Sequence, residues 1–200
     1  MRPRATGRRG LTLVECTVTM GVLAITLLAV GALHIAALRT WSWGMGSCSA
    51  DSYATVSVEQ MGSRVREAIR VSELTPTSVA VVLPQQDAQG HNALLATGGL
   101  PEGVELKYFL GNGSKQPDAS GRTLYEVRRP AAQAGQPWPY TLATRVGPEG
   151  SEGHITGVAF VDRSTVERQA VFVGVMSEAT YAGRCATSAA KGEFTLHNAP

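Results

Sequence analysis

The feature that most limits what this chain can fold into is an uncharged apolar run near its N-terminus. Residues 16–38 read CTVTMGVLAITLLAVGALHIAAL, without a formal charge and with His34 as the one titratable imidazole. As a helix with a rise of about 1.5 Å per residue, this run is about 35 Å long, enough to cross a hydrocarbon core of about 30 Å. The run therefore predicts a membrane-spanning helix.

Positive charge is concentrated before this run. Arg2, Arg4, Arg8 and Arg9 precede it with no acidic residue among the first ten, and only Arg39 follows it directly. Such a charge bias keeps the N-terminus in the cytoplasm. Without these four arginines, 14 basic residues (18 less 4) stand against 16 acidic ones. The body of the chain therefore has no electrostatic support for binding nucleic acid.

Glu15 lies at the start of the apolar run and needs an explanation. A carboxylate near a membrane costs several kcal/mol unless it lies at the interface, is paired or is neutralised. A secretory signal peptide explains the arginines, but its apolar region usually has about 7–15 residues. A plain membrane anchor accommodates the length but gives Glu15 no role. Glu15 is therefore the first candidate functional residue.

The segment Arg8-Arg9-Gly10, then Leu11-Thr12-Leu13-Val14-Glu15, resembles the N-terminus of type IV prepilins and type II secretion pseudopilins. The resemblance implies cleavage by prepilin peptidase between Gly10 and Leu11, N-methylation of Leu11, and pairing of Glu15 with the N-terminal amine of a neighbouring subunit. Glycine leaves room for a peptidase around the backbone. A carboxylate that is costly when unpaired fixes the register of neighbouring helices. The family most often starts its mature chain with phenylalanine, so Leu11 is a departure.

The pattern divides the chain into four parts. Residues 1–10 are the leader, residues 11–43 the transmembrane and assembly helix, residues 44–76 the periplasmic half of this stalk helix, and residues 77–200 a β-rich globular head. Pro76 bars the helix from continuing beyond about Leu74. Spacings of three and four predict an apolar stripe that packs on the head. Its members are Ala54, Val58, Met61, Val65, Ala68 and Ile69.

The head alternates short β-rich runs with turn-forming clusters. A second long amphipathic pattern is missing between these runs, which argues against parallel βαβ units. The expected fold class is α+β and pilin-like, with the long N-terminal helix packed on an antiparallel β-sheet head. The candidate strands are Ser78–Leu83, Val104–Leu110, Arg122–Arg129, Tyr140–Val146, Ile155–Asp162, Ala170–Glu178 and Gly192–His197.

The order of helix and strands resembles that of W-type minor pilins and J-type pseudopilins, on residues 65–71, 122–129 and 194–198. The resemblance implies a structural subunit that initiates or caps a type IV pilus or a type II secretion pseudopilus. Implied partners are other minor pilins, the major pilin, prepilin peptidase, the inner-membrane assembly platform and a tip adhesin. The implied location is the inner membrane, crossed once with the head in the periplasm, and then the filament tip at the cell surface.

The reactive side chains of the sequence do not form a recognisable catalytic or metal-binding motif. Cys48 and Cys185 both fall in the predicted periplasmic part, and two cysteines are what one disulfide needs; the sequence leaves open whether they pair. Nucleophile-elbow and phosphate-loop motifs are missing. The histidines have no zinc-site spacing, and the acids Asp118 and Asp162 do not fit a calcium loop. We therefore expect no enzyme, cofactor or metal site.

Two alternatives to the pilin-like interpretation differ in the mature N-terminus. An uncleaved, single-pass membrane-anchored periplasmic binding protein would keep residues 1–10. A soluble secreted protein would be released by ordinary signal peptidase near Ala32–Ala37. The pilin-like subunit would begin at Leu11.

Overall fold

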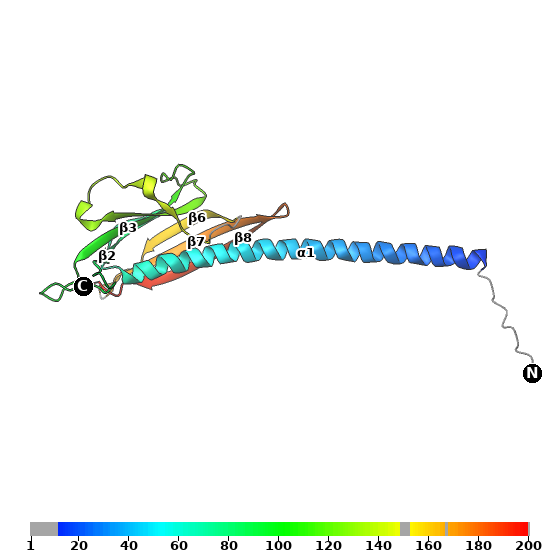
Figure 1. The fold of residues 1–200 in the computed structure, drawn as a ribbon, viewed down its shortest axis with the longest axis horizontal. Helices are drawn as coiled ribbons and strands as arrows, with labels where there is room; N and C mark the ends of the chain where they lie inside the picture. Colours follow the sequence, from blue (N-terminus) through cyan, green and yellow to red (C-terminus); the bar gives the residue numbers. More distant parts are fainter. Residues whose placement is uncertain (1–11, 149–152, 167, 200) are drawn as a thin grey trace, which may run out of the picture. The chain divides into compact units, whose positions relative to one another are not determined.

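The computed structural model describes residues 12–148, 153–166 and 168–199. The chain forms two compact units, one ending at Ser42 and the other comprising Trp43–Pro200. Helix α1 (Leu13–Glu67) contributes to both units, and all the strands belong to the second (Figure 1). The second part of α1 packs on antiparallel sheets, so the expected α+β, pilin-like fold class is confirmed.

In the first unit, α1 is apolar on every side. Its large aliphatic side chains are exposed, as in Leu13 (82%) and Leu28 (75%). Threonine hydroxyls donate back to the helix: Thr19 Oγ1 to the Glu15 carbonyl at 2.7 Å, and Thr26 Oγ1 to the Val22 carbonyl at 2.8 Å. Polar groups satisfied within the helix are what an apolar surrounding requires. This helix is long and apolar enough to cross a membrane.

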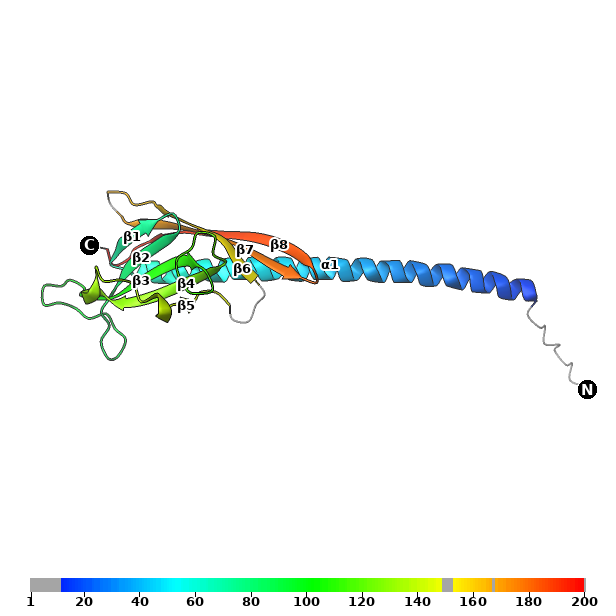
Figure 2. The same ribbon diagram turned by 90° about the horizontal axis from the view of Figure 1, so that it is seen from above.

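The strands form two antiparallel sheets, whereas the sequence analysis expected one. The five-stranded sheet has the order β1-β2-β3-β4-β5 and the three-stranded sheet the order β6-β7-β8 (Figure 2). The strands are β1 (Arg70–Thr75), β2 (Ser78–Pro84), β3 (Glu102–Gly111), β4 (Thr123–Pro130), β5 (Thr144–Arg145), β6 (Gly153–Asp162), β7 (Ala170–Tyr181) and β8 (Arg184–Thr195).

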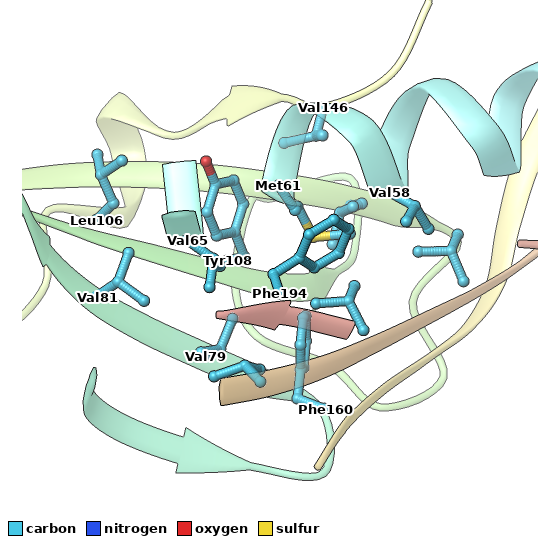
Figure 3. Packing of buried hydrophobic residues seen from close by; sticks show 14 of the residues in the cluster. Val58, Met61, Val65, Val79, Val81, Leu106, Tyr108, Val146, Phe160 and Phe194 are labelled. Atoms are coloured by element: carbon cyan, nitrogen blue, oxygen red, sulfur yellow. The ribbon is translucent and has the colours of Figure 1, made fainter. Parts of the chain in front are cut away.

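Residues 43–67 of α1 close the core between the two sheets. The predicted stripe is buried from Ala54 to Ala68, with Ala54, Met61 and Val65 fully inaccessible, whereas Ile69 lies beyond the end of α1 and is half-buried. Met61 and Val65 lie beside Phe194 of β8 and Tyr108 of β3 (Figure 3). Burying such side chains stabilises a fold by about 1.5–3 kcal/mol each. This part of the helix therefore belongs to the head.

Helix α1 ends at Glu67, earlier than the sequence predicted, and β1 follows where a helix was expected. The last helical carbonyls have no partners within a helix. Here the Arg66 carbonyl accepts the His197 backbone N–H at 2.9 Å, and the Glu67 carbonyl accepts Asn198 Nδ2 at 2.6 Å. Residues near the C-terminus thus cap the helix and fix its end.

Two other expected strands differ from the structure. Tyr140–Val146 is replaced by a 3₁₀ turn (Tyr140–Leu142) and the two-residue β5. The last strand starts eight residues earlier than expected, at Arg184 instead of Gly192. The cause is the turn at Ala182 and Gly183, whose φ angles of 49° and 74° suit a tight hairpin between β7 and β8.

The outer face of the five-stranded sheet is also covered. Phe109 and Tyr125 form a second cluster with Val127 and Ala143, and Trp138 and Tyr140 pack against it. The Trp138 ring lies 3.9 Å from the Arg129 guanidinium, and Arg129 Nε donates to Glu105 Oε2 at 2.6 Å. Segment 131–143 therefore closes over a buried ion pair on this face.

Candidate functional site

Glu15 forms a capping box with Thr12 at the start of α1. The Glu15 backbone N–H donates to Thr12 Oγ1 at 3.2 Å, and the Thr12 N–H donates to Glu15 Oε2, also at 3.2 Å. Thr12 Oγ1 donates to the same carboxylate oxygen at 3.3 Å. This reciprocal pattern satisfies two N–H groups that a helix start leaves unpaired. This capping box was not predicted, although its sequence signal, T-x-x-E before an apolar run, is present at residues 12–15.

Among the described residues, the negative charge of Glu15 has no charged partner beyond the capping box. Ion pairs within residues 12–148, 153–166 and 168–199 do not involve Glu15. Glu15 Oε1 accepts no hydrogen bond in that part of the chain, because both contacts from Thr12 go to Oε2. The N-terminal end of a helix favours a carboxylate by about 0.3–1 kcal/mol. Within the described residues, Glu15 Oε1 therefore has no partner.

Gly10 and Leu11, the predicted cleavage and N-methylation sites, lie outside the described residues. Thr12 is the first described residue, and it is exposed. His34, the imidazole of the apolar run, is exposed on α1. Cleavage and methylation therefore stay predictions from the sequence.

The structure does not bring Cys48 and Cys185 together. Both are free and exposed, as is Cys16. The position that a Cβ on Gly46 would take lies 3.6 Å from Ala186 Cβ, so Gly46 faces the β7–β8 hairpin. Cys48 is two positions further along α1, about 200° around the helix, and so points away from that hairpin. The orientation of α1 is the physical reason that the two thiols stay apart.

The head holds charged residues whose partners are structural. Burial, followed by the Glu126 carboxylate, raises the pKa of Tyr108 well above its usual value, and the Tyr108 hydroxyl donates to Glu126 at 2.7 Å. Lys107 Nζ donates to both oxygens of Glu73 at 2.7 and 2.8 Å. Contacts of this kind stabilise the sheet.

A groove of about 620 Å³ lies beside the end of α1, between β2, β3 and β4. Its charged lining residues are engaged in ion pairs: Arg64 with Glu67 at 3.1 Å, Glu102 with Arg70 at 2.7 Å, and Arg128 with Glu126 at 2.7 Å. In the part of the chain that the structure describes, no group of three or more His, Cys, Asp or Glu side chains is placed so that it could hold a metal ion. The candidate site is therefore the Thr12–Glu15 pair, whose carboxylate lies at the start of the apolar helix and has no ion pair among the described residues.

Comparisons of the chain with protein-family models, curated proteins and solved structures found no match.

Proposed function

We propose that this chain is a minor pilin or pseudopilin, a structural subunit that initiates or caps a type IV pilus or a type II secretion pseudopilus. The observation that carries the proposal is Glu15, a carboxylate without a charged partner among the described residues, at the start of an apolar helix. A leader ending in Arg9-Gly10 precedes it.

Cleavage after Gly10 would create the group that Glu15 needs. The new N-terminus at Leu11 is an amine that is largely protonated near neutral pH. In a bundle of apolar helices, the amine of one subunit would pair with Glu15 Oε1 of the next, while Oε2 stays with Thr12. An unpaired carboxylate there is strongly unfavourable, so this contact favours one register between subunits.

The apolar surface of residues 13–42 supports the same role. Its aliphatic side chains are exposed in the single chain, as in Leu33 (71%) and Ile25 (70%). Lipid covers such a surface while the subunit is in the membrane, and neighbouring helices would cover it in a filament. The subunit would wait in the inner membrane and then join other minor pilins and the major pilin.

Mass spectrometry of the mature N-terminus tests this proposal. We expect a chain that starts at Leu11, with a methyl group on its amine, and we expect Gly10→Leu to keep the full leader. A mature chain that starts at Met1 would instead identify an uncleaved anchor. A start within residues 32–37 would identify a secreted protein.

A matched pair of variants separates subunit pairing from helix capping. Glu15→Gln removes the charge, and we expect at least about tenfold less subunit co-isolating with filament components, equivalent to about 1.4 kcal/mol. Thr12→Val removes the capping hydroxyl but keeps the charge, and we expect it to assemble within about twofold of the parent chain. An equal loss of co-isolated subunit in both variants would show that Glu15 acts only as a helix cap.

A further inference from the structure

The outer edge of β8 is a long row of backbone groups without partners. Strand β8 is the last strand of the three-stranded sheet and pairs with β7 along all twelve of its residues without a register shift. Proline is absent from the strand. A regular edge of this length is a template for pairing with another strand, and monomeric proteins usually protect such edges.

The hairpin register identifies the residues whose backbone groups face outward. The Leu196 N–H donates to the Gln169 carbonyl at 3.0 Å, so the even-numbered residues of β8 face β7. In an antiparallel pair these positions alternate. The outward residues are therefore Cys185, Thr187, Ala189, Lys191 and Glu193. Their N–H and C=O groups have no backbone partner within the described residues.

The other sheet edges are protected. Strand β1 is six residues long and carries a bulge between Val71 and Glu73, and β5 has only two residues. Strand β6 also has a bulge, and it is tied to the other sheet by hydrogen bonds from Ile155 to Arg122 and from Phe160 to Pro76. Short length, bulges and cover are the usual protections. Of the edges that the structure describes, that of β8 has none of these three protections, and its charged residues are Arg184, Lys191 and Glu193 near its two ends.

We propose that the β8 edge is a strand-addition site for an extended segment of another polypeptide. Backbone hydrogen bonds would supply most of the affinity. The side chains of Thr187 and Ala189 are small and exposed, so they leave room for a strand alongside. Lys191 is exposed, whereas Glu193 is paired with Arg168 at 3.1 Å, so the edge favours a partner with an acidic residue near Lys191.

This inference goes beyond the proposed function and does not depend on it. Strand addition at β8 requires neither leader cleavage nor the Glu15 contact. The two proposals therefore fail separately: an uncleaved anchor can still bind a strand at β8, and a filament subunit can lack such a partner.

Residue-resolved hydrogen exchange on the full chain in detergent tests whether the edge is open. The backbone amides of residues 187, 189 and 191 should exchange about 100-fold faster than those of residues 188, 190 and 192, because only the even-numbered amides are bonded to β7. Equal protection of both sets would mean that the edge is already covered, and would overturn the proposal.

The partner is tested by photo-crosslinking in the native membranes, with p-benzoylphenylalanine at Thr187. Ala189→Pro removes one outward N–H without touching the bonds to β7, as prolines on edge strands do. Ala189→Thr is the matched control, since it keeps that N–H. We expect a crosslink to a different polypeptide that falls at least about tenfold with Ala189→Pro and stays within about twofold with Ala189→Thr.

The other outcomes overturn the proposal. A product of twice the chain's own mass would show that a second copy occupies the edge. A product that persists equally in Ala189→Pro would show a side-chain contact instead of strand addition. The absence of any crosslinked product would show that no polypeptide binds at the β8 edge. Unfolding by circular dichroism shows whether Ala189→Pro folds; if it does not, the exchange pattern of the unaltered chain still decides whether the edge is open.

Discussion

Gly62 sets how closely α1 approaches β8. A Cβ at this position would lie 2.2 Å from a carbon of the Phe194 ring, far inside van der Waals contact. Arg66, one turn further along α1, lies over the same ring at 5.1 Å from its centre. The absence of a side chain at Gly62 is therefore a packing requirement of the core.

Replacing Gly62 by alanine should destabilise the head. We expect Gly62→Ala to lower the free energy of unfolding by about 1–3 kcal/mol, because Phe194 must shift within a packed core. Gly44→Ala on the same helix is the control: a Cβ there has no atom within 4 Å, and helix propensity favours alanine by about 1 kcal/mol. Urea denaturation measures both, and similar values for the two variants would contradict this account.

Glu105 is a buried carboxylate held as an anion. Burial is the largest single influence and acts to raise its pKa, but the hydrogen bonds from Arg129 and Ser72 and the charges of Arg129 and Arg70 together lower the pKa below the usual 4.5. A carboxylate with a lowered folded pKa binds fewer protons when folded. Its stabilisation is therefore present above about pH 4.5 and is lost as the pH falls through the folded value.

We expect Glu105→Gln to lower the free energy of unfolding at neutral pH by about 3 kcal/mol, because it leaves Arg129 buried without its counter-charge. The loss of stability as the pH falls below about 5 should also become shallower than in the parent chain. Glu102→Gln is the control. Glu102 pairs with Arg70 but has a side chain 42% exposed, so it should cost less than about 1 kcal/mol. Denaturation at a series of pH values would contradict the account if the two variants behaved alike.

At the scale of elements, the β7–β8 hairpin depends on its two-residue turn. Ala182 has a φ of 49°, which a residue with a Cβ rarely adopts, and Gly183 has a φ of 74°. We expect Ala182→Asn to stabilise the head by about 0.5–1 kcal/mol, because asparagine tolerates this conformation. Gly183→Ala should destabilise by about 1 kcal/mol. Thermal melts measure both, and a change in the same direction for both variants would refute the turn assignment.

Strands with apolar, β-branched or aromatic runs could be predicted from the sequence, both where burial alternates, as in β7, and where both faces are buried, as in β2 and β3. Strands β2, β3, β4, β6 and β7 all lie where the sequence predicted them. Strand β1 was missed because an apolar stripe and Pro76 favoured a longer helix, whereas pairing with β2 decides its conformation. Residues 184–191 of β8, which the sequence did not predict as a strand, contain alanine, serine and lysine, whose weak strand preference is overridden by pairing with β7.

The candidate site was located only in part from the sequence. The sequence indicates Glu15 as a candidate functional residue, and the T-x-x-E spacing also indicates Thr12 as its capping partner. The division into two sheets, and the separation of Cys48 from Cys185, depend on contacts between residues far apart in sequence. Local patterns carry no information on such contacts.

At the scale of the whole molecule, the second unit should fold without the apolar helix. We expect a fragment of residues 43–200 to be soluble and to unfold cooperatively, because it retains the buried face of α1 with Tyr53, Met61 and Val65. A fragment of residues 70–200 lacks that face and should remain unfolded or aggregate. Circular dichroism and size-exclusion chromatography distinguish the two, and a folded shorter fragment would contradict the role given to α1.

The contacts that close the head join the second part of α1 to the last part of the chain. Hydrogen bonds between α1 and the last two strands or the residues beyond them span 127, 131 and 137 positions. Such distant pairings are formed slowly, so we expect refolding in about milliseconds to seconds by stopped-flow, and complete refolding within microseconds in temperature-jump traces would argue otherwise. During synthesis, the apolar face of α1 therefore stays exposed until the last strands have been translated. The nascent subunit is most prone to aggregate during this interval.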